Sequence, residues 1–317
     1  MTCQRCYHTT VKKFGTYGKR KIQRYRCHNC SATFSACGPK LENHLISLER
    51  AEQIIALMME GMSIRAISRV TNTDQNTIMS LLLTVGKRCR RIFDAKVRGV
   101  KARYLELDEL WNFVHTKQQR LASDDPADWG DTYTWIALDA ESKMVLSYLV
   151  AKRDGLSALE FVTDLSKRVE GRPQVTSDGF KAYIGAVEES FGADVDFAQL
   201  VKIYGKPDNA GPDWYGPPEV IETVPTPVSG NPDLAHICTS HAERSNLSVR
   251  MHLRRYTRLT SGFSKKLSHL KAAVDIYALW YNACRVHLTL RVTPMMQAGL
   301  SDHIWSIREM LTCQPQT

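Results

Sequence analysis

The chain has 317 residues, of which 43% are hydrophobic and 24% are charged, a balance typical of a globular protein with one sizeable core and one or two small modules. No stretch approaches the roughly 20 apolar residues that a membrane-spanning helix requires, so we expect no membrane partner. The formal net charge of +9 is informative mainly through its distribution along the chain.

Positive charge is concentrated in three segments. Residues 1–41 contain nine bases and no acid, residues 87–103 contain eight bases and one acid, and residues 244–274 contain eight bases and no acid. Solvated lysine-rich faces are the alternative explanation, but such faces usually mix both signs of charge. The three segments therefore favour a polyanionic partner, and nucleic acid is the leading candidate.

The first ten residues, MTCQRCYHTT, lack the charged and then apolar pattern of a signal peptide. We therefore expect a protein that is not exported and whose thiols stay reduced. Under that condition the nine cysteines are not a disulfide framework.

Two CxxC pairs near the N-terminus predict a structural zinc site. Cys3 and Cys6 form the first pair, and Cys27 and Cys30 form the second after twenty intervening residues. Each pair turns two thiolates onto one cation, and two pairs complete a tetrahedral four-sulfur site, whereas a redox centre is typically a single CxxC on a helix. We expect a zinc ribbon over residues 1–40. Bases between the pairs are candidate phosphate contacts, namely Lys19, Arg20 and Lys21.

Residues 41–98 predict three helices followed by a basic linker. Apolar periodicity marks a first helix that ends near Gly61, Ser63 caps a second, and Thr73 or Asp74 begins a third. Two helices joined by a short turn are typical of a helix-turn-helix module, although a plain helical linker has the same pattern. In such a module the start of the last helix contacts base edges. The candidate contacts are Gln75, Asn76 and Thr77.

The middle of the chain alternates predicted strands and helices. The stretch ELDELWNF, residues 106–113, reads as a hydrophobic strand that carries three acids. Further strands are expected at 131–140, 143–152, 172–178 and 198–204, with helices at 155–170 and 180–190. Three antiparallel strands followed by alternating helices and strands define a ribonuclease-H-like α/β arrangement with a mixed five-stranded sheet. We expect this domain to span residues 99–300.

Three acids far apart in the chain are candidates for one metal site. In the expected sheet, Asp108 on the first strand and Asp178 at the end of the fourth lie side by side, and two close carboxylates repel each other unless a cation lies between them. A predicted helix over residues 241–256 supplies Glu243, with Asn246 and Arg250 on the same polar face. Taken singly, Asp178 could be only a helix cap and Glu243 only an exposed helix residue.

Two further segments complete the prediction. Residues 205–240 are rich in proline and glycine near their start and read as a long surface insertion before the Glu243 helix. Residues 263–290 read as a long amphipathic helix that covers the sheet, and residues 301–317 as a C-terminal tail.

Three blocks of the sequence resemble a known family. LDELWNFV, TSDGFKAY and HAERSNLSVRMHLRRYTRLTSGFSKKL are similar to the catalytic blocks of DDE transposases of the insertion-sequence-one type. The resemblance extends from the cysteine pairs to about Leu290. It implies that Asp108, Asp178 and Glu243 form a catalytic triad. It also implies a bacterial, cytoplasmic and nucleoid-associated protein with a zinc-ribbon and helix-turn-helix front end.

The resemblance further implies a chemistry and its partners. The triad would hold Mg²⁺ or Mn²⁺, and two such ions can activate a nucleophile and stabilise the leaving oxygen of a phosphodiester. The partners would be DNA, both terminal inverted repeats and target DNA, in a homodimer or larger synaptic assembly. Candidate DNA contacts in the last block are Asn246, Arg250 and Arg254. Two alternatives remain open: an inactive DNA-binding regulator, and a metal-dependent nuclease or resolvase of the same fold.

Overall fold

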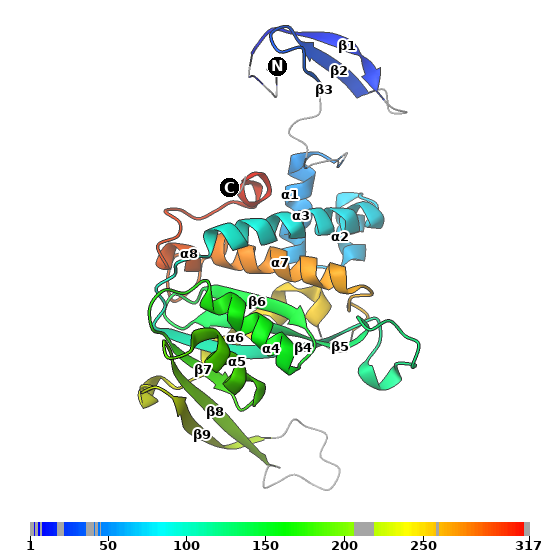
Figure 1. Ribbon diagram of the computed structural model, residues 1–317. Helices are drawn as coiled ribbons and strands as arrows, with labels where there is room; N and C mark the ends of the chain where they lie inside the picture. The colour runs from blue at the N-terminus through cyan, green and yellow to red at the C-terminus, as the bar shows by residue number, and fades with distance from the viewer. Residues whose placement is uncertain are drawn as a thin grey trace. The chain divides into compact units, whose positions relative to one another are not determined.

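The computed structural model describes residues 3, 6, 8–17, 22–35, 41, 44, 46–205, 219–257 and 260–313 (Figure 1). By its internal packing the chain forms two compact units, Met1–Gln53 and Ile54–Thr317. Within the described ranges, every helix is too short or too polar to cross a membrane.

The first unit contains a small antiparallel sheet. Its strands β1 (Val11–Tyr17), β2 (Ile22–Cys27) and β3 (Thr33–Ser35) pair in the order β1-β2-β3. Because β2 ends at Cys27, the pairing of Cys27 with Val11 on β1 holds the first residue of the second cysteine pair in place. The expected bases Lys19, Arg20 and Lys21 lie outside the described residues.

Three helices follow in the predicted order, and the first begins at Leu48 instead of at Leu41, where the apolar periodicity starts. They are α1 (Leu48–Met59), α2 (Ile64–Thr71) and α3 (Gln75–Lys96). The Ser63 hydroxyl accepts a hydrogen bond from the Ala66 N–H at 3.2 Å, and the Asp74 carboxylate accepts one from the Asn76 N–H at 2.9 Å. Asn72 adopts the left-handed conformation that ends α2, so the turn before α3 is short.

The core of the second unit is a mixed six-stranded sheet in the order β6-β5-β4-β7-β8-β9. Its strands are β4 (Tyr104–Val114), β5 (Gly130–Asp139), β6 (Val145–Ala151), β7 (Gln174–Asp178), β8 (Asp196–Gly205) and β9 (Glu219–Ser229). Strands β4, β7 and β8 are parallel neighbours, and the remaining pairs are antiparallel.

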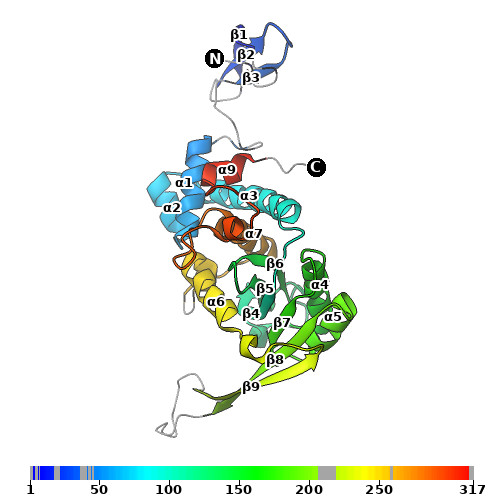
Figure 2. The same ribbon diagram turned by 90° about the vertical axis from the view of Figure 1, so that its left-hand side faces the viewer.

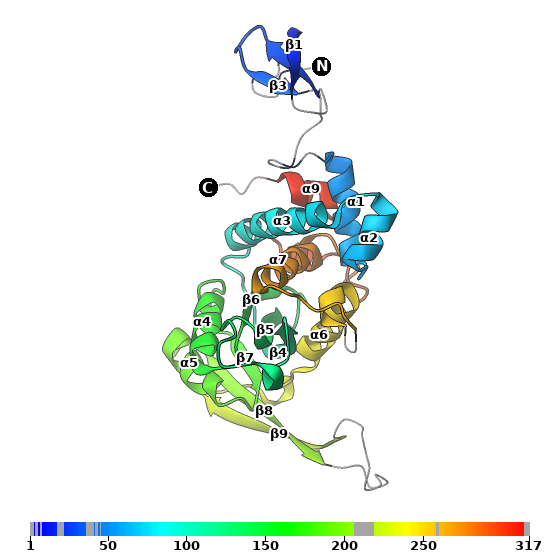
Figure 3. The ribbon, with the colours of Figure 1, turned by 90° about the vertical axis from the view of Figure 1, so that its right-hand side faces the viewer.

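Helices cover both faces of this sheet. Helices α4 (Gly155–Ser166) and α5 (Ala182–Phe191) lie on one face, and α6 (Ser240–His252) lies on the other (Figures 2 and 3). Helix α7 (Leu267–Ala283) packs between β6 and α3, and is shorter than the 263–290 span expected from the sequence. The backbones of α3 and α7 approach closely, because a Cβ on Gly86 would lie only 2.6 Å from that of Ala272. Two short helices, α8 (Pro294–Gln297) and α9 (Ile307–Thr312), end the described chain.

The sheet has one strand more than the five expected, and this strand comes from the segment read as an insertion. Strand β9 pairs antiparallel with β8 and forms the edge of the sheet, with Pro225 opposite Leu200 and Pro227 opposite Ala198. Prolines argue against a central strand but are compatible with an edge strand, where an N–H can point away from the sheet. Residues 206–218 of the insertion lie outside the described residues.

The helix expected over residues 241–256 also differs from the structure. Helix α6 ends at His252, Leu253 is extended, and a short 3-10 turn spans Arg254–Tyr256. The break lets both apolar residues beyond it enter the core: Leu253 and Tyr256 are each 3% exposed. The Tyr256 hydroxyl hydrogen-bonds the Thr134 hydroxyl on β5, which fixes this turn against the sheet.

Candidate active site and candidate metal centres

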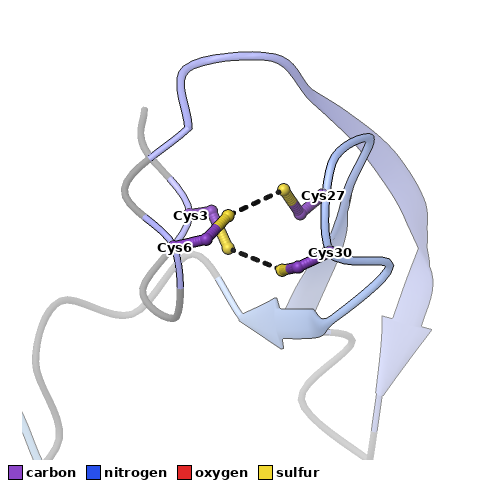
Figure 4. Close-up of side chains that lie close together, drawn as sticks. All are labelled: Cys3, Cys6, Cys27 and Cys30. Carbon is purple, nitrogen blue, oxygen red and sulfur yellow. Dashed lines mark hydrogen bonds between the residues drawn. The ribbon is translucent and has the colours of Figure 1, made fainter.

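The four N-terminal cysteines converge on one point (Figure 4). Sγ of Cys3 lies 3.6 Å from that of Cys30, and Sγ of Cys6 lies 3.6 Å from that of Cys27. All four sulfurs lie within 4.8 Å of one another. Zinc at a sulfur distance of about 2.3 Å places tetrahedral ligands roughly 3.8 Å apart. The cluster therefore has the donor atoms and the spacing to bind structural zinc.

One thiol of this cluster is already biased towards the form that a metal needs. A backbone hydrogen bond from His8 is the main cause that lowers the pKa of Cys6 to about 6. Although a backbone hydrogen bond from Ala32 favours the thiolate, burial and the hydrogen bond to Cys6 raise the pKa of Cys30 to about 11, so the thiols of the cluster differ in how readily they become the thiolates that zinc binds.

A second candidate site lies where β7 ends beside the middle of β4. The parallel register pairs Glu106 with Thr176, and two residues further along each strand come Asp108 and Asp178. Alternation along β4 places Glu106 and Asp108 on the same face of the sheet, and this face is the one covered by α6, because both carboxylates accept hydrogen bonds from that helix. Glu243 lies in the first turn of α6, so three distant segments contribute to one region.

All three predicted carboxylates line a single open cavity of about 720 Å³. Basic side chains line it as well. Its acidic and basic lining residues are Asp108, Asp178, Glu243, Arg153, Lys181 and Lys202. The arrangement of sheet and helix therefore brings together what the sequence separates by up to 135 positions.

Asp178 and Glu243 each meet a cation of the protein itself. Nη2 of Arg153 lies 3.1 Å from Oδ2 of Asp178, and the same guanidinium binds Oε2 of Glu109 at 3.0 Å. The Lys202 ammonium pairs with Oε1 of Glu243. Two of the three carboxylates are therefore neutralised by side chains that line the cavity.

Asp108 instead meets amides. Its Oδ2 accepts a hydrogen bond from Nδ2 of Asn246 at 2.6 Å, and its Oδ1 accepts one from the Glu109 N–H at 2.9 Å. Burial raises the pKa of Asp108 to about 7, and the nearby charges of Glu109, Asp178 and Glu243 act in the same direction. A nearby cation would favour the ionised form of this carboxyl group.

The donor set of the cavity fits a hard divalent cation. Carboxylate oxygens are the ligands that Mg²⁺ and Mn²⁺ prefer, and repulsion among three of them is relieved by such an ion. The ligand atoms are less closely gathered than the thiols: among the described residues, the cysteines form the cluster whose atoms all lie within 4.8 Å. The three carboxylates are instead bonded to Arg153, Lys202 and Asn246.

Several residues of the cavity escaped the sequence analysis. Arg153 follows β6, and Lys202 is a lone base within the otherwise mostly apolar strand β8. No pattern in the sequence singled out either residue. Glu106 and Glu109 lie on β4, the strand that also carries Asp108, but the sequence pattern assigned no role to either residue. The Thr239 hydroxyl donates to Oε1 of Glu243 at 2.7 Å.

The remaining candidate DNA contacts occupy different environments. Gln75 and Asn76 are exposed at the start of α3, and Thr77 is half-buried there. Asn246 is 9% exposed and engaged with Asp108, so it lies inside the candidate site. The Arg250 guanidinium donates to the Tyr256 carbonyl oxygen at 3.4 Å, and Arg254 is exposed.

No protein-family model and no curated protein sequence matches the chain. Among solved structures, similarity is found to a synaptic complex of the piggyBac transposase with hairpin DNA, at 11% identity and a TM-score of 0.39 over 87% of this chain and 72% of that one. It is also found to a Mos1 transposase paired-end complex, at 14% identity and a TM-score of 0.20 over 48% of this chain and 57% of that one. A third similar structure is the Mos1 strand transfer complex, at 14% identity and a TM-score of 0.21 over 50% of this chain and 58% of that one. At these scores the likeness is remote and assigns no activity.

Proposed function

We propose that the chain is a DNA transposase of the DDE class, similar to the insertion-sequence-one type, in which Asp108, Asp178 and Glu243 hold divalent metal ions. One observation carries the proposal: these acids come from β4, β7 and α6 and line the same cavity. The strand order from β6 to β8, three antiparallel strands followed by two parallel ones, supports a ribonuclease-H-like catalytic domain.

The cavity supplies the parts that phosphodiester chemistry requires. Divalent ions bound by the carboxylates would activate a water or a 3′-hydroxyl and stabilise the departing oxygen. Arg153, Lys181 and Lys202 would bind the phosphates on either side of the reacting bond, because cations lining an acidic site are suited to orient a polyanion. Reaching the phosphates requires Arg153 and Lys202 to leave Asp178 and Glu243.

The parts outside the cavity support DNA recognition. We assign residues 1–40 to a zinc ribbon, 41–98 to a helix-turn-helix module and basic linker, 99–300 to the catalytic domain with the insertion 205–240, and 301–317 to a tail. Exposed Gln75 and Asn76 at the start of α3, with Thr77, would contact base edges of the terminal repeats. Joining two DNA ends requires an assembly of at least two copies.

The decisive experiment uses a labelled duplex made from the DNA that flanks the coding segment. The wild-type protein should nick this duplex at a 3′ end in Mg²⁺ or Mn²⁺, and should join a precleaved end to plasmid DNA. Asp108→Asn removes an anionic metal ligand and leaves one acceptor oxygen for the Asn246 amide and the Glu109 N–H, so nicking should fall by roughly 10³-fold or more with DNA binding retained.

Each alternative has its own outcome. Nicking without joining would identify a nuclease or resolvase of the same fold. Binding of the flanking DNA without any nicking would identify a regulator. Nicking that survives Asp108→Asn would contradict the assignment of the metal site.

A further inference from the structure

Glu106 is a buried acid near the cavity that has no role in the reaction described above. It is 3% exposed and precedes Asp108 by two residues on β4. Its Oε2 accepts hydrogen bonds from the backbone N–H groups of His241 at 2.8 Å and Ala242 at 2.9 Å. Its Oε1 lies 2.6 Å from Nδ1 of His241. The carboxylate therefore binds the first turn of α6, the helix that carries Glu243.

Helix α6 depends on this contact because its own N-cap residue is engaged elsewhere. As far as the chain is described, the Thr239 side chain caps no amide of α6, and its hydroxyl donates to Glu243 instead. The first N–H groups of a helix have no partner within the helix and carry a partial positive charge. In α6 two of them are satisfied by Glu106, which belongs to a distant strand.

We propose that Glu106 is a positioning residue that sets the separation of Asp108 and Glu243, an inference that rests on the proposed metal site. Few residues separate this contact from the two acids, both along β4 and along α6. Glu106 and Asp108 lie on the same face of β4, and Ala242 is adjacent to Glu243 in α6. One turn later, Asn246 binds Asp108. Glu106 thus holds the first turn of α6 against β4, and Asn246 holds the next turn of the same helix against Asp108.

The choice of an acid at this position supports the inference. A buried strand position is most simply filled by an apolar side chain, because burying a carboxylate is unfavourable unless hydrogen bonds satisfy it. Both oxygens of Glu106 have partners, and those partners belong to residues 241 and 242. An apolar residue would pack against the same helix without specifying where along the strand its first turn lies.

The chain offers a matched control for testing this role. Asp139 on β5 is 4% exposed, and its carboxylate accepts hydrogen bonds from the Ser142 N–H at 2.9 Å and the Glu141 N–H at 3.3 Å. It stabilises the turn between β5 and β6, and the amides that it binds belong to that turn and not to α6. Glu106→Gln and Asp139→Asn each remove the charge of a buried carboxylate that accepts hydrogen bonds from two backbone N–H groups, so we expect similar losses of stability. Only Glu106 binds the start of α6, whereas Asp139 binds the turn between β5 and β6.

Metal affinity without DNA separates positioning from general stability. We expect calorimetry of the full-length, metal-free protein to show Mn²⁺ binding in the wild type that Asp108→Asn removes. Glu106→Gln should weaken this binding by about tenfold, the scale on which groups supporting metal ligands act, and Asp139→Asn should leave it within twofold. Hydrogen exchange should accelerate by tenfold or more at the amides of His241 and Ala242 in Glu106→Gln only.

A conservative variant keeps the test decisive if Glu106→Gln fails to fold. Glu106→Asp retains the charge but shortens the reach by one methylene, so Mn²⁺ binding should still weaken while the melting temperature stays close to that of the wild type. Equal Mn²⁺ affinity in the wild type and the folded Glu106 variants would overturn the inference alone. Equal losses in Glu106→Gln and Asp139→Asn would also overturn it. A wild-type protein without Asp108-dependent Mn²⁺ binding would overturn the proposed function and this role together.

Discussion

The two candidate metal centres are built in opposite ways. The four cysteines come from two short pairs within the first 30 residues, and their sulfurs already lie at zinc-like separations. The acids of the cavity come from three segments between residues 108 and 243, and each one is bonded to another group of the protein. The first site is closed by its own ligands, and the second is open to solvent and lined by cations.

This difference fits the roles proposed for the two sites. A structural centre gains most when its ligands converge on the metal and leave no position free. A centre that acts on DNA must release its metal-facing groups to a substrate, so its acids need partners in the absence of metal and DNA. Arg153 and Lys202 provide those partners and reduce the repulsion among the carboxylates.

The largest expected effect concerns the closed centre. Cys27→Ser removes one of four zinc ligands, and structural zinc contributes roughly 10–16 kcal/mol in small zinc domains, so we expect loss of bound zinc and unfolding of the β1–β3 sheet. Mass spectrometry of the native protein and hydrogen exchange over residues 22–35 would measure both. Cys238→Ser, outside the cluster, is the control and should retain one zinc per chain. Retention of zinc by Cys27→Ser would contradict the four-cysteine assignment.

The next effect concerns the stability of the open centre without metal. The pKa of Asp108 is raised from 3.8 to about 7, so between these pH values the unfolded chain has lost a proton that the folded chain keeps. Stability therefore falls as pH rises through this window. Asp108→Asn should raise the free energy of unfolding at pH 8 by up to about 4 kcal/mol, and should change it little at pH 4. Denaturation in a chelator at both pH values tests this, and a gain that is equal at the two pH values would exclude the titration of Asp108 as its cause.

The smallest effect concerns the internal cations. Lys202→Met removes the partner of Glu243, and because partly exposed ion pairs contribute up to about 1 kcal/mol, we expect Mn²⁺ to bind up to roughly fivefold more tightly without DNA. Lys181→Met is the control, because Lys181 lines the same cavity and, within the described residues, pairs with none of the three acids. Calorimetry would compare the two variants. Weaker Mn²⁺ binding in Lys202→Met would show that Lys202 supports the site rather than competing with metal.

Much of this architecture could be predicted from local patterns. The period of two along residues 104–114 placed Asp108 on the face opposite the core leucines, and the strand that ends at Asp178 followed from its apolar run. The caps Ser63 and Asp74 were readable because a helix start depends on side chains a few residues away. The expected strand order placed Asp108 beside Asp178, whereas Glu243 was expected from the polar face of a later helix and from the family resemblance.

What escaped prediction depends on contacts between distant segments. Strand β9 was missed because Pro225 and Pro227 argue against a strand unless its place at the sheet edge is known. The end of α6 was missed because Leu253 and Tyr256 continue the helical apolar spacing while leaving the helix. The partners of Glu106 and Glu243 depend on where α6 docks, which periodicity does not encode.

The prolines of β9 also affect how copies of the chain can meet. An exposed edge strand normally offers a row of N–H groups to which a strand of another molecule can add, and this is a common start of aggregation. Proline has no N–H, so Pro225 and Pro227 remove two adjacent donors from the outer edge. A strand of a second molecule that added to this part of β9 would therefore lack two of its hydrogen-bond donors.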